Sequence, residues 1–184
     1  MRVRHPRVVV EVVSSVEDDR LFRLLETGAV DLAIVRSASV SPPVEVRPAA
    51  MCSYAVAIPS ASSLAQGQKR IALSDLSGLP RIATADGTAF ADDVAAPVVA
   101  SDAEMALGLV GAGAGAAVLP ALFASVAHSG VTVRPLRDIL PPFRLSIATT
   151  SRLVPQASDL ADLLVAAISG WPNASPAESD AAPA

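Results

Sequence analysis

The sequence is short of cysteine and of aromatic residues, and each shortage excludes a class of protein. Because Cys52 is the only cysteine, the chain can form no internal disulfide and no cysteine-based metal cage. Aromatic residues make up 3% of the 184 residues, too few for the stacking platform on which single-stranded nucleic acid binds. A lone cysteine is also typical of proteins of the cytoplasm, and we expect this chain there.

Basic charge is scarce as well. The 14 lysines and arginines are outnumbered by 18 acidic residues, which gives a formal net charge of −4. One local exception is the N-terminus, where Arg2, Arg4, His5 and Arg7 cluster, a pattern typical of a solvated surface. Since proteins bind DNA largely through Lys and Arg contacts to phosphate, the sequence predicts that this chain makes no direct contact with DNA.

The groups that an enzyme needs are few. His5 lies in the basic N-terminal segment and His128 near the end of a predicted helix, and we interpret both as surface residues. The adjacent pairs Asp18-Asp19 and Asp92-Asp93 project about 100° apart if helical, so they suit caps better than one shared site. The sequence therefore predicts no catalytic residue, no metal and no cofactor.

Small aliphatic residues are what the sequence has in quantity. Hydrophobic residues make up 52% of the chain, which favours a layered α/β fold with buried strands. The predicted strands cover residues 8–13, 30–35, 44–46, 53–58, 81–84, 98–100, 116–119, 131–133 and 143–149. The predicted helices are one that ends at Gly28, a short one from Ile71, a small one near 91–95, one that begins at Ser101 or Asp102, one that Pro120 opens and one that Pro155 opens.

The first 35 residues have the pattern strand, helix, strand. Such a β-α-β unit predicts that strands 8–13 and 30–35 are parallel and joined by a right-handed crossover. Two such groups, joined by extended segments, predict two lobes. Lobe I comprises residues 1–54 with 146–170, lobe II comprises 55–145, and 171–184 form a disordered tail.

The stretch from Ser101 to Pro120 predicts a helix, a tight glycine turn and a buried strand. Its glycines could also form a phosphate-binding loop, but such a loop needs a strand before the glycines and a helix after them. No charge occurs from Met105 through Ala127, as in a membrane span, but alanine and glycine dominate the run and Pro120 interrupts it. The sequence therefore favours caps, close packing and a buried core, with no membrane contact.

Polar residues that follow predicted strands are the candidates for ligand binding. Ligands in open α/β sheets bind at the carboxyl ends of strands, which here predicts a cleft between the lobes. Hydroxyls, amides and a guanidinium there would suit a small anion or acid. The candidates are Ser14, Ser15, Arg36, Ser37, Thr84, Asp86, Thr88, Ser101 and Asp102. Each is also a common turn or cap residue, so a single position leaves both roles open; together they favour a ligand site.

The order and spacing of four segments resembles the effector-binding (substrate-binding) domain of LysR-type transcriptional regulators. The segments are HPRVVVEV at 5–12, LETGAVDLAI at 25–34, LSDL at 73–76 and LVGAGAGAAVLP at 109–120. The resemblance implies the two-lobed α/β fold of type 2 periplasmic binding proteins. It also implies a sensor without enzyme activity that binds a small, often acidic effector and transmits its binding through dimer or tetramer rearrangement.

The N-terminus departs from that family pattern. Residues 1–6 resemble the end of the first long helix of such a sensor domain. The resemblance thus implies that the DNA-binding domain, the linker helix, the first strand and most of the first helix are missing. A missing strand would leave segment 8–13 open to pairing with another chain. A transport-type solute-binding protein, a non-functional regulator fragment and an enzyme on the same fold are the alternatives.

Overall fold

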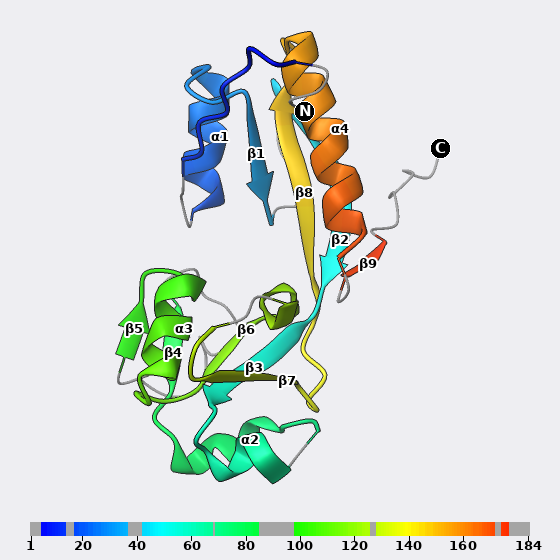
Figure 1. The fold of residues 1–184 in the computed structure, drawn as a ribbon. Coiled ribbons are helices and arrows are strands. Elements are labelled where there is room, and N and C mark those ends of the chain that lie inside the picture. Colours follow the sequence, from blue (N-terminus) through cyan, green and yellow to red (C-terminus); the bar gives the residue numbers. More distant parts are fainter. Residues whose placement is uncertain are drawn as a thin grey trace. The chain divides into compact units, whose positions relative to one another are not determined.

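The computed structural model in Figure 1 describes residues 5–13, 17–36, 42–67, 69–84, 98–125, 128–171 and 174–176. The chain forms two compact units. Unit 1 comprises Met1–Cys52 and Phe143–Ala184, and unit 2 comprises Ser53–Pro142. Unit 2 is therefore one continuous stretch of sequence, while unit 1 is assembled from both ends of the chain.

Unit 1 has three layers, with a sheet between two helices (Figure 1). Its strands lie in the order β1 (Leu32–Val35), β8 (Phe143–Thr150), β2 (Val44–Cys52) and β9 (Ala174–Pro176), and all neighbours are antiparallel. Helix α1 (Asp18–Glu26) covers one face, where its Leu21 and Leu25 meet Ala148 of β8. Ile147, the residue before Ala148 in β8, points to the opposite face, because successive residues of a strand point to opposite sides. Helix α4 (Pro155–Ser169) covers that face.

The predicted strand at 8–13 is wrong. These residues are extended but belong to no strand, and the Val9 and Val12 side chains are 90% and 83% exposed. β-Branched residues favour extended backbone, but a strand also needs a neighbour to bond with, and no described strand lies beside them. The predicted parallel β-α-β unit fails with it: β1 pairs with β8, and the pairing is antiparallel.

The predicted disordered tail is also partly wrong. Ala174–Pro176 form strand β9, which pairs with Ala50–Cys52 at the edge of β2. The hydroxyl of Ser169 donates to the carbonyl of Ala49 at 2.7 Å and fixes the end of α4 beside the same strand. Backbone pairing needs no apolar side chains, so composition gave no signal for it.

Unit 2 is built around a three-stranded antiparallel sheet in the order β6 (Ala117–Pro120), β3 (Tyr54–Pro59) and β7 (Val131–Pro135). Helix α3 (Ala103–Gly111) packs on one face, against Ala57 of β3. The other face carries α2 (Ser63–Gly67) and the 3₁₀ helix η1 (Leu73–Gly78). A parallel pair, β4 (Ile82–Thr84) and β5 (Val98–Ala100), completes the unit.

The glycine turn between α3 and β6 confirms the prediction of a helix, a tight turn and a buried strand. Gly113 has a φ of +82°, a left-handed conformation that favours glycine after a helix. Every residue of β6 is buried. Pro120 differs from prediction: it is the last residue of β6, and the turns after it form the short 3₁₀ helix η2 (Ala121–Ser125).

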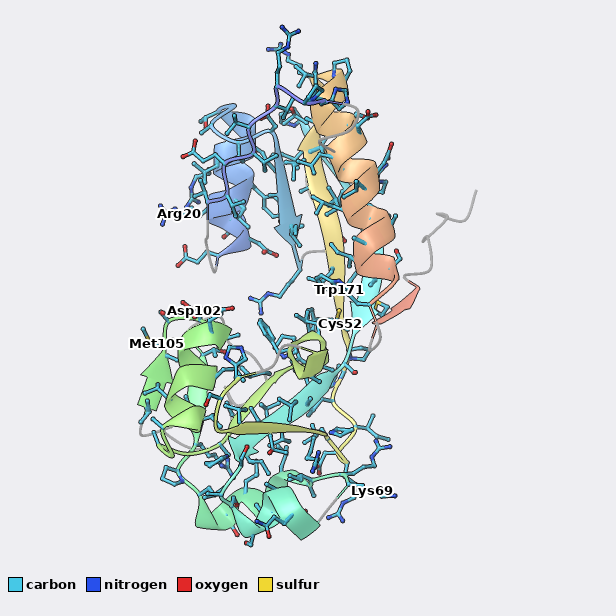
Figure 2. The ribbon with its side chains drawn as sticks, viewed as in Figure 1. Arg20, Cys52, Lys69, Asp102, Met105 and Trp171 are labelled. Carbon is cyan, nitrogen blue, oxygen red and sulfur yellow. The ribbon has the colours of Figure 1, made fainter. Side chains whose placement is uncertain are left out.

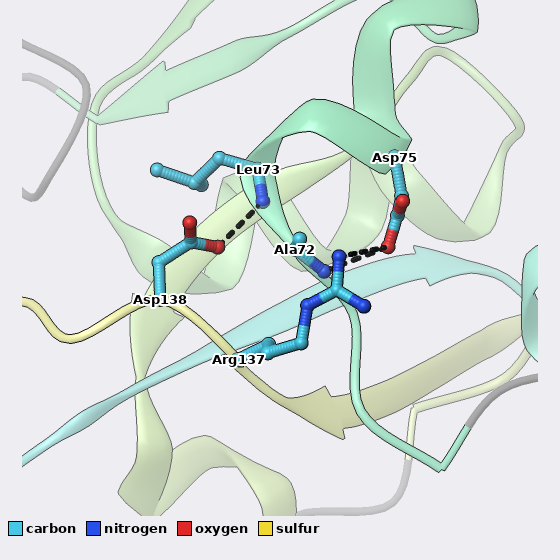
Figure 3. Close-up of polar contacts among 5 residues, drawn as sticks. All are labelled: Ala72, Leu73, Asp75, Arg137 and Asp138. Carbon is cyan, nitrogen blue, oxygen red and sulfur yellow. Dashed lines mark hydrogen bonds and ion pairs between the residues drawn. The ribbon is translucent and has the colours of Figure 1, made fainter.

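Two aspartates hold η1 to the segment that follows β7 (Figure 3). Asp138 accepts a hydrogen bond from the Leu73 amide at 2.7 Å, and Asp75 accepts one from the Ala72 amide at 2.9 Å. Arg137 lies 3.7 Å from the Asp75 carboxylate. The first amides of a helix have no partner within it, so these carboxylates satisfy groups that would otherwise be unpaired.

We expect Asp138→Ala to lower the free energy of unfolding by about 1 kcal/mol, the usual cost of losing a helix-capping side chain. Asp138→Asn keeps an acceptor oxygen at the same position and should lose less than half as much. Urea unfolding followed by circular dichroism measures both. Equal losses for the two variants would show that charge, and not the hydrogen bond to Leu73, is what Asp138 contributes.

Candidate ligand-binding site

The parallel pair β4 and β5 brings two of the predicted ligand residues together. Thr84 of β4 is paired with Ala100 of β5, so the next residue along, Ser101, lies at the same edge of the pair. Thr84 is 6% exposed, whereas Ser101 and Asp102 are exposed. The carboxyl ends of β4 and β5 and the start of α3 thus form one polar edge within unit 2, which we call the β4–β5 edge.

Asp102 is the N-cap of α3, as the sequence predicts. Its carboxylate accepts a hydrogen bond from the Met105 amide at 2.8 Å, and the Ser101 hydroxyl donates to the same carboxylate at 2.8 Å. Figure 2 labels Asp102 and Met105 at this end of the helix. The bond from Met105, followed by that from Ser101, lowers the pKa of the Asp102 carboxyl. Asp102 is therefore ionised at neutral pH and compensates the positive end of the helix.

Arg36 belongs to unit 1 and lies directly after β1. Its backbone amide donates to the Asp18 carboxylate at 3.0 Å, which joins the end of β1 to the first turn of α1. Arg36 therefore occupies a strand end, as predicted. Five other candidates, Ser14, Ser15, Ser37, Asp86 and Thr88, lie outside the described residues, as does the small helix predicted near 91–95.

The remaining reactive side chains offer no catalytic set among the described residues. His5 is paired with Asp159 of α4 at 2.8 Å, so it is tied to the protein and is not a free surface group. Cys52 is buried, and burial raises the pKa of its thiol, which keeps it protonated and unreactive. No group of three or more His, Cys, Asp or Glu in the described ranges could hold a metal ion.

Sequence reasoning missed one small pocket in unit 1, between α4 and the sheet. Its volume is about 170 Å³, and its lining includes Glu45, Arg47, Thr149 and Ser158. Arg47 is paired with Asp162 of α4 at 2.6 Å, so its charge is already matched. Alternation along β2 places Glu45 and Arg47 on one face and could have indicated this group.

The comparisons with known proteins establish the family. Residues 1–169 match the LysR substrate binding domain, and the chain belongs to that family. The family domain is the effector-binding part of transcriptional regulators, which is not an enzyme. No curated protein matches the chain at the required significance. Among the described residues, no helix is long and apolar enough to cross a membrane.

Solved structures of LysR-family proteins share the fold. HinK, a LysR family transcriptional regulator from Pseudomonas aeruginosa, is 21% identical with a TM-score of 0.72, over 91% of this chain and 62% of HinK. A reduced form of OxyR from N. meningitidis is 20% identical with a TM-score of 0.70, over 96% of this chain and 88% of that one. The BenM effector binding domain with its effector benzoate is 18% identical with a TM-score of 0.68, over 92% and 82%.

These structures confirm the predicted fold class, the periplasmic-binding-protein-like α/β fold of LysR effector-binding domains. The chain spans about 62% of the length of HinK, so it corresponds to a part of such a regulator's length. At this level of identity, the likeness gives the fold and leaves the ligand to be argued from the residues.

Proposed function

We propose that this chain senses a small organic acid in the cytoplasm and transmits its binding to a transcriptional response. The match to the LysR substrate binding domain over residues 1–169 is the observation that carries this proposal. The BenM effector binding domain, whose effector is benzoate, offers an example of an acid in the same fold. The chain's net charge of −4 supports a sensing role without direct DNA contact.

The β4–β5 edge supplies the hydroxyls of this proposed site. Thr84 and Ser101 lie at neighbouring strand ends, where a carboxylate oxygen can accept hydrogen bonds from the Thr84 hydroxyl and from backbone amides, while the Ser101 hydroxyl donates to Asp102. Arg36, which belongs to unit 1, stays a predicted contact for an acid, because a guanidinium binds a carboxylate through two parallel bonds. Ser14, Ser15, Ser37, Asp86 and Thr88 stay contacts proposed from the sequence alone.

The ionised carboxylate of Asp102 limits how an acid can bind at this edge. It already accepts from Met105 and Ser101 and would repel a second carboxylate nearby. An effector acid should therefore take its contacts on the Thr84 side of the edge.

Isothermal titration with a panel of carboxylates, benzoate included, tests the sensing function. We expect at least one acid to bind and to raise the melting temperature, because a ligand that binds only the folded state stabilises it. A panel without heat of binding and without any thermal shift would contradict the proposal.

Three variants test the site separately from the function. Thr84→Ala should lose most of the affinity while the circular dichroism spectrum stays unchanged. Ser101→Ala should lose less, because the Ser101 hydroxyl already donates its proton to Asp102. Asp102→Asn keeps an acceptor for the Met105 amide and removes the charge. An acid should then bind about threefold more tightly, which corresponds to the repulsion between two unit charges about 7 Å apart in water. Binding by the wild-type protein with no change in any variant would leave the sensing function standing and reject the β4–β5 edge as its site.

A further inference from the structure

Residues 8–13 (VVVEVV) are an extended segment with no described backbone partner beyond its first residue. The one described backbone bond runs from the Val8 amide to the His5 carbonyl, at 3.2 Å. All the valines from Val9 to Val13 are at least half exposed. A segment with five valines, one charge and no proline has the composition of a strand, so its exposed amides and carbonyls are ready to pair.

Strand β1, in the same unit, offers an edge to which such a segment can be added as a strand. It lies at the end of the sheet order and pairs only with β8 among the described strands. Its sequence, Leu-Ala-Ile-Val, contains no charge and no proline, the two features that usually protect an edge. Ile34 is 43% exposed although its neighbour across the sheet, Ile147, is buried. The outer edge of β1 is therefore apolar and pairs with none of the strands that the structure describes.

The other described end of this sheet is protected in ways that β1 is not. β9 is three residues long and ends in Pro176, which has no amide to donate. Short strands and proline are both devices that stop further pairing. Among the strands of unit 1 that the structure describes, β1 thus has the edge that can accept another strand.

Within one chain, residues 8–13 are anchored at both ends of the segment and do not pair with β1. His5 bonds to Asp159 of α4, and the other end leads to Glu17, the residue before α1. Helices α1 and α4 lie on opposite faces of the sheet, so the segment passes from one face to the other without joining the β1 ladder (Figure 1). Each copy thus carries both the segment and the β1 edge, and neither has a strand partner at this position among the described residues.

We propose that two copies of this chain pair reciprocally, with residues 8–13 of each copy added as a strand to the β1 edge of the other. The exchange is closed, since each copy gives one strand and receives one. The only charge in the segment sets which way it faces. Glu11 must point to the open face beside Ile34, and the alternation then turns Val10 and Val12 toward the α1 side.

Sedimentation velocity over a range of concentrations tests the pairing in the full chain. We expect a dimer, and we expect it to weaken when a proline removes a strand amide. Neighbouring amides point to opposite sides of a strand, so at least one of Val10→Pro and Glu11→Pro removes a bond to β1 and weakens association about tenfold or more. Val10→Thr keeps the amide and the β-branched shape and should remain dimeric.

A cross-link tests which residues meet. In a Cys52→Ser background, a Glu11→Cys copy mixed with a differently tagged Ile34→Cys copy should form a mixed disulfide under mild oxidation. Arg20→Cys, on the exposed side of α1, replaces Glu11→Cys in the control mixture and should not cross-link with Ile34→Cys. Any one of four results would overturn the proposal. They are a monomer at all concentrations, a dimer that survives both proline substitutions, species larger than a dimer, and equal cross-linking in the two mixtures.

Discussion

Replacing Gly115 by alanine should destabilise the protein severely, lowering the free energy of unfolding by about 3–5 kcal/mol. A Cβ at Gly115 would lie 2.2 Å from the Pro80 carbonyl oxygen, and this backbone atom cannot move aside. The Ala116 amide donates to that same oxygen at 2.8 Å, so a shift that relieves the clash also breaks the hydrogen bond. Gly115 has a φ of +155°, which adds strain for any other residue. Urea unfolding followed by circular dichroism measures the loss.

Two glycines nearby serve as controls for this prediction. Gly113 has a positive φ, but nothing lies within 4 Å of its would-be Cβ, so Gly113→Ala should cost only about 1 kcal/mol of backbone strain. Gly108 lies inside α3 with open space around it, and Gly108→Ala should stabilise by about 0.5–1 kcal/mol. If Gly115→Ala cost no more than Gly113→Ala, the close approach of Pro80 would be refuted.

The Leu107→Ala variant should lose about 3 kcal/mol of unfolding free energy. The Leu107 side chain is fully buried where α3 meets the sheet of unit 2, in a cluster with Ile82 and Leu119. Its removal leaves a cavity and weakens the contact that seats α3. Because Asp102 begins this helix, the same variant should also weaken any ligand held at the β4–β5 edge.

Met105 provides the matched control on the same helix. Its side chain is similar in size to that of leucine but is 52% exposed, so Met105→Ala should change the free energy of unfolding by less than about 0.5 kcal/mol. Chemical unfolding of both variants, in parallel with wild type, makes the comparison. Equal losses at the two positions would mean that α3 does not pack on the sheet through its Leu107 face.

The parts of the fold that local chemistry determines could be predicted from sequence. A capping aspartate, an apolar helix face and glycines that end it are all local signals, and α3 with its glycine turn and β6 is the result. Proline at the first helical position likewise predicted the start of α4 at Pro155. In each case the residues that decide the structure are neighbours in sequence.

Features that depend on distant partners could not be predicted in this way. Residues 8–13 have the composition of a strand but no neighbouring strand, and β9 has a neighbour in β2 although its composition indicates disorder. A strand is defined by hydrogen bonds to another segment, so the sequence of one segment cannot decide it. The direction of β1, antiparallel to β8, also depends on a segment more than a hundred residues away.

The candidate site divides along the same line. That Thr84 ends a strand and Ser101 follows one is a local property, and the sequence predicts it. That the two strands are parallel neighbours, which brings both residues to one edge, is not local. The bonding of the Asp102 carboxylate to Met105 and Ser101 is a structural role that competes with ligand binding. A cap and a ligand contact use the same residue types, so the sequence alone could not separate them.

The assembly of unit 1 from both ends of the chain has a consequence for synthesis on the ribosome. β8 is the central partner of β1 and β2, yet it is made roughly a hundred residues after them, when all of Ser53–Pro142 has already been synthesised. Domains generally fold as units while the chain is being made. Unit 2 can therefore complete its fold first, while β1 and β2 wait unpaired in the nascent chain. That interval is when chaperones that shield apolar segments would act on this protein.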